Sequence, residues 1–450
     1  MNINDFKNFM RGKSVAVIGI GVSNTPVINM LLSFGARVTA RDKCKEEELE
    51  IPVSELREKG VSFILGDDYL KNITEEIIFK TPGIRPDKPE LVSAKEKGTF
   101  LTSEMEMFFE LCPAEITAVT GSDGKTTTTT LIYEMLKAEG YKCHLGGNIG
   151  KPLLSEIENI SACDKVVLEL SSFQLQTMSK SPDIAVVTNV SPNHLDYHTD
   201  MDEYIEAKKN IFSHQNADSL LVVNHNNEIT KSFAKHAKGR VTYFGRSNTE
   251  GIYVRDGVIY AYGTPVVKTS DILLPGEHNV ENYMAAIGAV WGKVGAETIK
   301  KISKTFGGVE HRIEFVREKD GVRYYNDSIA SSPTRARACL YSFDKKIIVI
   351  AGGYDKKIPF DDFGKDLVKR AKAVLLLGET AKDIRKAIEN AQGEKPPIVM
   401  AKDLEDAVFK AKDIAKAGDV VVLSPACASF DMFKNFEQRG NMFKQIVAGL

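Results

Sequence analysis

One stretch of the sequence, TAVTGSDGKTTTTT, has residue types and spacing that could bind phosphate. Backbone N–H groups of a glycine turn point at phosphate oxygens, and a following helix adds partial positive charge at its N-terminus. Lys125 could reach the terminal phosphates of a nucleotide, and Thr126 could offer its hydroxyl to Mg²⁺. The usual pattern G-x-x-x-x-G-K-[ST] is shortened, because Val119 stands where its first glycine belongs. Gly121 still frees the backbone where the loop begins.

Other polar residues follow apolar runs along the chain. Glu169 ends the run VVLEL and could bind Mg²⁺ through a carboxylate oxygen, although a solvated strand end explains it equally. His194, in NVSPNHLDYH, is by itself more typical of a packed or solvated histidine than of a ligand. Arg312, in EHRIEF, could neutralise phosphate charge. Asp327, in YYNDS, could accept hydrogen bonds from ribose hydroxyls or could simply cap a turn.

An incomplete dinucleotide fingerprint lies near the N-terminus. The stretch GIGVSN has the first two glycines, but Asn24 stands in place of the third. Asp42 follows at roughly the 20-residue distance that the fingerprint requires. The pattern indicates a Rossmann-like crevice that holds some nucleotide. It leaves a nicotinamide-dependent dehydrogenase as an unfavoured alternative, which an absence of NAD(P)H binding would dismiss.

These residues must be positioned by strands that alternate with helices. Apolar runs predict strands, and charged or amphipathic segments between them predict helices, so the rhythm is βαβ and favours parallel, doubly wound sheets. Helices are predicted at 103–112 and 278–295. Strands are predicted at 14–21, 36–42, 61–66, 76–83, 165–175, 184–190, 219–225, 345–353, 373–378, 396–401 and 419–425.

Composition excludes several classes of protein. The chain has 450 residues, which suggests about three domains. Its formal net charge of −2 implies no attraction to nucleic acid or to a membrane surface. Six scattered cysteines without a C-x-x-C pair are typical of reduced thiols. No signal-peptide run and no apolar stretch of about 18 residues is visible, so we expect a cytoplasmic protein.

Over nearly its whole length the sequence resembles the ATP-dependent Mur ligases of peptidoglycan synthesis. The shared motifs are TGSDGKTTT, GGNIG, ELSSFQL, NVSPNHLDYH, LPGEHNVENYMAA, EHR and NDS. The long motif LSPACASFDMFKNFEQRGNMF is similar to the D-glutamate-adding branch of the family. The resemblance implies an α/β fold of three domains: a Rossmann-like uridine-nucleotide-binding domain at 1–103, a central P-loop ATPase domain with a parallel sheet at 104–308, and a Rossmann-like C-terminal domain at 309–450 that binds D-glutamate and closes over ATP.

The resemblance also implies a reaction. ATP would phosphorylate the carboxylate of UDP-N-acetylmuramoyl-L-alanine, and the amine of D-glutamate would attack the acyl phosphate, which releases ADP and phosphate. Two Mg²⁺ ions are expected, with Mn²⁺ as a substitute. The substrates are small molecules, so neither nucleic acid nor a membrane span is expected, and the family suggests a monomer. Two anions must meet in this reaction, so catalysis should depend on positioning and on cations.

The resemblance assigns roles to individual residues. For ATP they are Gly121, Ser122, Asp123, Gly124, Lys125, Thr126, Thr127, Asn279, Asn282, Arg312 and Asp327, with His311 beside Arg312. For metal they are Thr126, Glu169, His194 and Lys208, the last as a carbamate. The catalytic set is Lys125, His194, Lys208 and Arg312. For the uridine end of the substrate they are Val22, Ser23, Asp42 and Lys43, and for its muramoyl-alanine end Asn148 and Ser171. For D-glutamate they are Ser331, Lys356, Ser429 and Phe436. Without the resemblance, Lys208 would be interpreted as a lysine on a helix surface.

Two positions depart from the family pattern. The stretch after Asp327 reads DSIASS where the family has DSKATN, so Ile329 replaces a lysine. Either that lysine is dispensable or Arg335 or Lys356 supplies the charge. The stretch GGYDKKIPF also departs from GGDGK, which leaves the role of Asp355 open. The remaining alternatives are another amide ligase of the same superfamily and a P-loop ATPase that drives motion or assembly.

Overall fold

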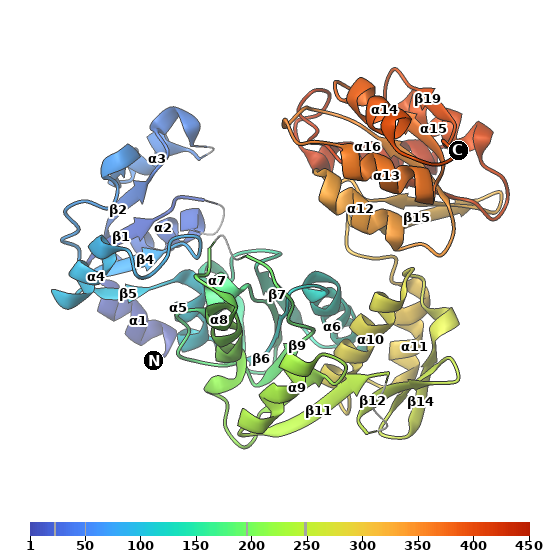
Figure 1. Cartoon of the computed structure of the whole chain (residues 1–450). Helices are drawn as coiled ribbons and strands as arrows, with labels where there is room; N and C mark the ends of the chain where they lie inside the picture. The colour runs from blue at the N-terminus through green and yellow to red at the C-terminus, as the bar shows by residue number, and fades with distance from the viewer. Residues whose placement is uncertain (22–23, 50, 195–196, 247–249) are drawn as a thin grey trace. The chain divides into compact units, whose positions relative to one another are not determined.

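The computed structural model describes residues 1–21, 24–49, 51–194, 197–246 and 250–450 of the chain. It divides into two compact units, one formed by 1–269 with 281–302 and the other by 270–280 with 303–450. Three sheets organise the chain, two in the first unit and one in the second (Figure 1). The predicted α/β class is therefore confirmed. The division into three domains at 103/104 and 308/309 stays a prediction.

The first sheet is parallel throughout, in the order β3-β2-β1-β4-β5. Its strands are β1 (Ser14–Ile18), β2 (Arg37–Asp42), β3 (Ser62–Leu65), β4 (Ile77–Lys80) and β5 (Phe100–Thr102). Its helices are α1 (Ile3–Met10), α2 (Asn24–Ser33), α3 (Val53–Glu58) and α4 (Pro89–Glu96). The order reverses direction at β1, as in Rossmann-like sheets, and such sheets bind ligands at this switch point, beyond the carboxyl ends of the strands.

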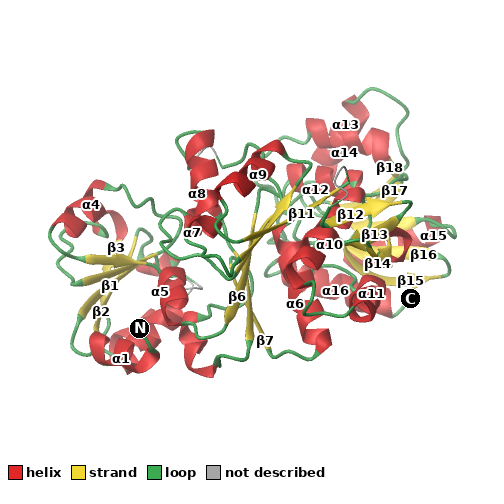
Figure 2. Cartoon of the chain, turned by 90° about the horizontal axis from the view of Figure 1, so that it is seen from below, coloured by secondary structure: helices red, strands yellow, loops and turns green. Residues whose placement is uncertain are grey.

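The second sheet has the order β14-β13-β12-β11-β10-β9-β6-β8-β7. Its strands are β6 (Glu115–Thr120), β7 (Cys143–Gly147), β8 (Lys165–Glu169), β9 (Ile184–Val187), β10 (Leu220–Asn224), β11 (Arg240–Gly245), β12 (Ile252–Arg255), β13 (Val258–Ala261) and β14 (Thr264–Lys268). Its helices are α5 (Glu104–Leu111), α6 (Lys125–Glu139), α7 (Ser172–Leu175), α8 (Met201–Ser213), α9 (Glu228–Phe233), α10 (Glu277–Val290) and α11 (Ala296–Thr305). The seven strands from β7 to β12 in this order, β6 included, are parallel to one another. Strands β12, β13 and β14 pair as two antiparallel hairpins. Helices α6 and α8 cover opposite faces of this sheet (Figure 2).

The third sheet has the order β15-β16-β20-β17-β18-β19 and is parallel except for the β15–β16 hairpin. Its strands are β15 (Glu314–Lys319), β16 (Val322–Asn326), β17 (Ile347–Ala351), β18 (Ala371–Leu376), β19 (Ile398–Met400) and β20 (Val420–Leu423). Its helices are α12 (Pro333–Tyr341), α13 (Asp361–Arg370), α14 (Ala381–Asn390), α15 (Leu404–Ile414) and α16 (Phe436–Ala448). Short 3-10 turns lie at Glu46–Glu48, Gly66–Asp68, Leu154–Asn159, Ala234–His236 and Thr269–Asp271.

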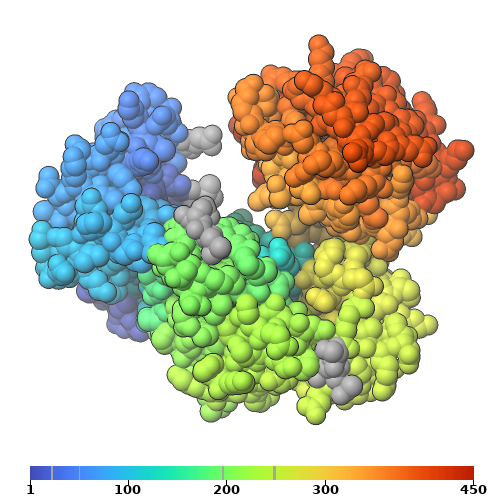
Figure 3. All heavy atoms as spheres, in the orientation of Figure 1, coloured from blue at the N-terminus to red at the C-terminus, as the bar shows by residue number. Residues whose placement is uncertain are grey.

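Within the first unit, the N-terminal segment that forms the first sheet lies directly against the segment that forms the second sheet, as the adjoining blue and green atoms show (Figure 3). Arg85, after β4, makes an ion pair of 2.9 Å with Glu203 on α8 and donates to the carbonyl of Tyr197. Helix α5, which lies within the helix predicted at 103–112, contributes Met105, Met107 and Phe108 to the core. None of the helices among the described residues is long and apolar enough to cross a membrane.

One predicted strand is wrong in its second half. Residues 165–175 are not one strand, because β8 ends at Glu169 and α7 begins at Ser172. Ser171 ends the extended run by capping α7: its hydroxyl accepts from the Gln174 amide, and the Gln174 side chain accepts from the Ser171 amide. This reciprocal capping box satisfies amides that a helix leaves unpaired at its first turn. The turn leaves Glu169 as the last residue of β8, at the carboxyl end of the strand.

Candidate functional site

The glycine loop lies between β6 and α6 and requires its two glycines. Gly121 has a φ of +153° and Gly124 a φ of +77°. A Cβ on Gly121 would lie 1.9 Å from Thr188 Oγ1, and one on Gly124 would lie 2.3 Å from Asn282 Oδ1. Only glycine fits such close approaches. The loop therefore delivers its amides and the N-terminus of α6 to one place, which is the geometry that binds phosphate.

The loop is held by the segment that follows β9. The amides of Ser122 and Asp123 donate to the backbone and side-chain oxygens of Asn189, both at 2.9 Å. Ser122 Oγ lies 2.9 Å from the carbonyl of Ser191 and 3.0 Å from the hydroxyl of Tyr204 on α8. Thr188 Oγ1 donates to the carbonyl of Asp123 at 2.6 Å. The loop is thus held by hydrogen bonds from the segment after β9 and from α8.

Two lysine ammonium groups meet at the start of the loop. Lys125 Nζ donates to the carbonyls of Gly121 at 3.0 Å and Ser122 at 2.8 Å. Lys208 Nζ, on α8, donates to the same Gly121 oxygen at 2.9 Å and lies 4.6 Å from the centre of the Tyr204 ring. Lys208 is 1% exposed, so its interpretation as a helix-surface lysine is wrong. Burial first, and then the charge of Lys125, lower the pKa of Lys208 well below its ordinary value.

A buried carboxylate stands on the neighbouring strand. Glu169 ends β8 and is 2% exposed. Its Oε1 accepts from Asn148 Nδ2 at 2.8 Å. Its Oε2 is buried and has no hydrogen-bond partner within the described part of the chain. A buried carboxylate oxygen is costly unless something pairs with it, so a cation is the group that this oxygen lacks.

Other predicted residues of the first unit follow the carboxyl ends of strands β6, β8 and β9. Thr126 and Thr127 lie in the first turn of α6, and Thr126 is nearly buried. His194 is exposed, has a φ of +56°, and its ring lies 4.9 Å from that of Phe173. Ser171 uses its hydroxyl in the cap of α7.

Helix α10 carries the two predicted asparagines across the boundary between the units. Asn282, in the first unit, accepts from Thr128 Oγ1 at 3.3 Å and faces Gly124. Asn279, in the second unit, donates from its side chain to the carbonyl of Pro275 at 2.6 Å. Both are buried. The structure therefore brings Asn282 directly to the glycine loop.

At the first sheet, Asp42 organises the loop of the incomplete fingerprint. Its Oδ2 accepts from the amide of Ile20 at 2.6 Å, and its Oδ1 accepts from the amide of Cys44 at 2.9 Å. Asn24, in place of the third glycine, donates to the carbonyl of Gly19 at 2.8 Å. Lys43 is exposed beside this loop. Val22 and Ser23 lie outside the described residues.

In the second unit, His311 and Asp327 are buried side chains at the carboxyl end of β16. His311 Nδ1 lies 2.9 Å from Asn326 Nδ2, an amide that donates, so Nδ1 is unprotonated. Burial lowers the pKa of His311. Asp327 accepts from Ser424 Oγ at 2.8 Å, and burial raises its pKa to about 7 despite that bond. Arg312, next to His311, is exposed.

The residues predicted for D-glutamate follow β16, β17 and β20. Ser328 Oγ donates to the carbonyl of Phe436 at 2.7 Å, which joins two of these segments. Ser429 is buried and Lys356 is exposed, as is Arg335, while Ser331 and Ile329 are partly buried. Asp355, whose role the sequence left open, makes an ion pair of 2.6 Å with Lys357.

Sequence reasoning missed residues that hold the loops. Asn189, Ser191 and Tyr204 bind the glycine loop. Asn189 and Ser191 lie within the motif NVSPNHLDYH and Tyr204 follows it on α8, so the motif was the signal that could have pointed to them. Arg439 is 2% exposed and donates to the carbonyls of Ser328, Cys427 and Ala428. Its place in the motif FEQRG was visible, but its burial was not.

The donor set fits a hard cation only in part. Mg²⁺ prefers oxygen ligands, which Glu169 Oε2 and the Thr126 hydroxyl supply. Lys208 fits as a ligand only if its ammonium is converted into an anionic oxygen donor. Within the described ranges, no group of three or more His, Cys, Asp or Glu side chains could by itself hold a metal ion.

Two family models match the chain. Residues 119–290 match the Mur ligase middle domain, and residues 311–427 match the Mur ligase glutamate ligase domain. A protein of Acetivibrio thermocellus named UDP-N-acetylmuramoylalanine–D-glutamate ligase is 56% identical over 99% of this chain and 98% of its own length. A protein of Clostridium kluyveri with the same name is 54% identical over 99% of both.

Solved structures support the fold. The crystal structure of a UDP-N-acetylmuramate–alanine ligase from Thermotoga maritima aligns with a TM-score of 0.58 at 20% identity, covering 97% of this chain and 99% of that one. A structure of a UDP-N-acetylmuramoyl-L-alanyl-D-glutamate–2,6-diaminopimelate ligase aligns with a TM-score of 0.57 at 19% identity, covering 92% and 86%. At these identities the likeness is one of fold alone.

Proposed function

This chain belongs to the Mur ligase family, and from that premise we propose that it joins D-glutamate to UDP-N-acetylmuramoyl-L-alanine with the hydrolysis of ATP to ADP and phosphate. The full-length identity of 50–56% to relatives named for that ligation supports this choice of substrates. The product is a precursor of peptidoglycan, on which cell shape and cell division depend. We propose that the enzyme works in the cytoplasm as a monomer.

The observation that carries the proposal is the cluster of Lys125, Lys208 and Glu169 around the glycine loop. Two ammonium groups share the Gly121 oxygen, and the loop amides and the first turn of α6 add further positive potential. An anion with several negative charges is the ligand that such a cluster favours. ATP meets that description, and Lys125 is placed to leave the loop carbonyls and bind its terminal phosphates.

Phosphoryl transfer to a carboxylate solves a chemical problem. A carboxylate is a poor electrophile, because an amine does not displace oxide from it. Its acyl phosphate has phosphate as a leaving group, and the amine of D-glutamate attacks the acyl carbon, forming the amide bond as the carbon–oxygen bond to phosphate breaks. The chain's residues need only orient the reactants, exclude water and offset negative charge.

Mg²⁺, when bound, offsets the negative charge that develops during phosphoryl transfer. We propose that Thr126 and Glu169 would hold one ion, that His194 would hold a second, that Lys208 as a carbamate would supply a further oxygen ligand, and that Mn²⁺ substitutes. The lowered pKa of Lys208 supports the carbamate, because only an uncharged amine adds CO₂. The reaction forms an N–C bond and releases one proton, which leaves an anionic oxygen donor.

In this proposal the remaining predicted residues bind the three substrates: the uridine nucleotide, ATP and D-glutamate. Asp42 and Lys43, at the end of β2 in the first sheet, would bind the uridine end together with Val22 and Ser23, and Asn148 and Ser171, on either side of Glu169, would bind the muramoyl-alanine end. Asn279, Asn282, Asp327 and Arg312 would contact ATP. The D-glutamate residues would be Ser331, Lys356, Ser429 and Phe436.

Release of ADP in a coupled assay tests the proposal. The purified protein, Mg²⁺, ATP and UDP-N-acetylmuramoyl-L-alanine are combined with D-glutamate, L-glutamate, L-lysine or L-alanine. Turnover with D-glutamate alone is expected. ADP release that is equally fast without any amino acid would instead favour an ATPase, and a preference for L-lysine or L-alanine would assign a different amide ligase.

A further inference from the structure

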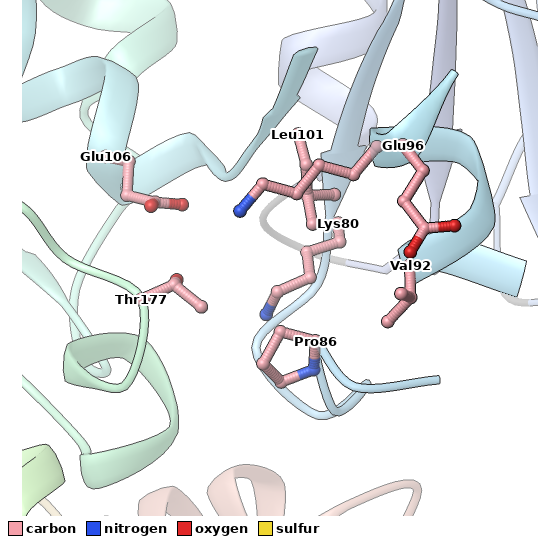
Figure 4. A pocket seen from close by; sticks show the side chains of 8 residues that line it. Lys80, Pro86, Val92, Glu96, Leu101, Glu106 and Thr177 are labelled. Atoms are coloured by element: carbon pink, nitrogen blue, oxygen red, sulfur yellow. The ribbon is translucent and has the colours of Figure 1, made fainter. Parts of the chain in front are cut away.

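A cavity lies in the first unit, away from the glycine loop. Its volume is about 580 Å³, within the range of roughly 300–1,000 Å³ that is typical of small-molecule sites. It lies between the end of β4, helix α4, strand β5, helix α5 and the segment after α7 (Figure 4). Pro86, Val92 and Leu101 give it an apolar wall. The proposed reaction uses none of its lining residues.

The side chain of a largely buried lysine faces the cavity. Lys80 is the last residue of β4 and is 2% exposed, and Figure 4 shows its side chain ending in the cavity. Among the residues that the structure describes, its ammonium forms neither a hydrogen bond nor an ion pair. Burial lowers the pKa of Lys80, and the carboxylate of Glu106 partly opposes this effect. A largely desolvated ammonium that faces a cavity without an ion-pair partner favours an anion in that cavity.

A carboxylate faces the same cavity from another element. Glu106, on α5, points into the cavity beside Thr177 (Figure 4). Burial raises the pKa of Glu106, while the hydroxyls of Ser103 and Thr177 oppose that rise. No direct ion pair joins Glu106 to Lys80 in the described part of the chain, although each lowers the electrostatic cost of the other. The two opposite charges therefore face the same cavity without forming an ion pair, and a ligand in the cavity could bridge them.

We propose that this cavity binds a small zwitterion with an apolar body, of the size of an aliphatic amino acid or dipeptide. The ligand's carboxylate would pair with Lys80 and its ammonium with Glu106. Its apolar side chain would lie against Pro86, Val92 and Leu101. Lys95 and Glu96 at the exposed part of the lining add one charge of each sign, so the four ionisable groups sum to zero and favour a ligand without net charge.

Isothermal titration calorimetry on the full chain tests this inference. The probes are L-leucine and L-leucyl-L-leucine, compared with isovalerate, which lacks the ammonium, and isoamylamine, which lacks the carboxylate. Leucine carries no side-chain carboxylate, so binding is separable from the proposed ligation, and the assay needs no turnover. We expect at least one zwitterion to bind below about 10 mM and each truncated probe to bind at least about tenfold more weakly.

Variants assign the binding to this cavity. Lys80→Met keeps the length of the side chain and removes its charge, and Glu106→Gln removes the opposite charge. Each should weaken binding of the zwitterion at least about tenfold, whereas Lys97→Met, on the exposed end of α4, should leave it unchanged. The proposal is overturned if neither zwitterion binds, if isovalerate or isoamylamine binds as tightly, or if both cavity variants bind like the unchanged protein.

Discussion

Lys125 and Lys208 donate to the same carbonyl oxygen, that of Gly121, at 3.0 and 2.9 Å. One lysine comes from the start of α6 and the other from the middle of α8, and these helices cover opposite faces of the second sheet. Two like charges at one acceptor repel each other, and the repulsion contributes to the lowered pKa of Lys208. The arrangement becomes favourable when an anion is present, which is why it marks the nucleotide site in our proposal.

Replacing Lys125 by methionine should remove the cation that binds the terminal phosphates. We expect kcat to fall by about 100-fold or more, because an interaction that stabilises developing charge is lost. The measurement is coupled ADP release at saturating substrates. Lys137→Met, in the last turn of the same helix, is the matched control and should retain turnover. Full activity of Lys125→Met would remove this lysine from the mechanism.

Lys208 should carry CO₂ in the active protein. With ¹³C-labelled bicarbonate and Mg²⁺, a carbamate carbon signal should appear in the NMR spectrum of the unchanged protein and be absent in Lys208→Met. Turnover should fall in that variant. Its thermal stability should not, because methionine removes a buried charge whose burial is unfavourable. A carbamate signal that persists in Lys208→Met would place the modification on a different lysine.

The sequence predicted those parts of the fold and site that depend on local pattern. Apolar runs located most parallel strands, and the glycine spacing at 121 and 124 located the loop between β6 and α6. Strands β12 to β14 were not predicted, since their short hairpins are only half buried and alternate weakly. The turn after Glu169 was also missed, because SSFQL is apolar enough for a strand and only the reciprocal cap of Ser171 and Gln174 ends it.

Residues whose role depends on distant contacts could not be predicted from pattern. Lys208 is a lysine in a helix of mixed polarity, and its burial follows from the packing of α8 over the Gly121 carbonyl. Asn189 opens the motif NVSPNHLDYH and Tyr204 follows that motif on α8, but neither residue type indicates that it holds Ser122 or Asp123. Asn24 was interpreted only as a departure from the dinucleotide fingerprint. In the structure its side-chain amide donates a hydrogen bond to the carbonyl of Gly19 and so holds the loop.

A methyl group on Gly121 should disrupt the loop more than one on another glycine with a positive φ. Gly121→Ala would place its Cβ 1.9 Å from Thr188 Oγ1, whereas Gly140→Ala, with a φ of +107°, meets no atom within 4 Å. Backbone strain of about 1–3 kcal/mol applies to both, and the clash applies to Gly121 alone. We expect a larger loss of Tm and of ATP affinity for Gly121→Ala. Equal losses of Tm and ATP affinity in the two variants would show that the close approach of residue 121 to Thr188 does not affect stability or binding.

Asp327 should make the second unit less stable as the pH rises from about 4 to about 7. Burial raises its pKa in the folded protein from 3.8 to about 7, so in this window the folded protein binds a proton that the unfolded chain has lost. Stability is then fully present below the unfolded pKa and falls as the pH approaches the folded pKa, by up to about 4 kcal/mol for a shift of this size. Asp327→Asn cannot ionise, so its unfolding free energy should fall less across the same window. Urea denaturation of both proteins at several pH values measures the difference. Parallel pH profiles would mean that Asp327 keeps an ordinary pKa and is ionised in the folded protein at neutral pH.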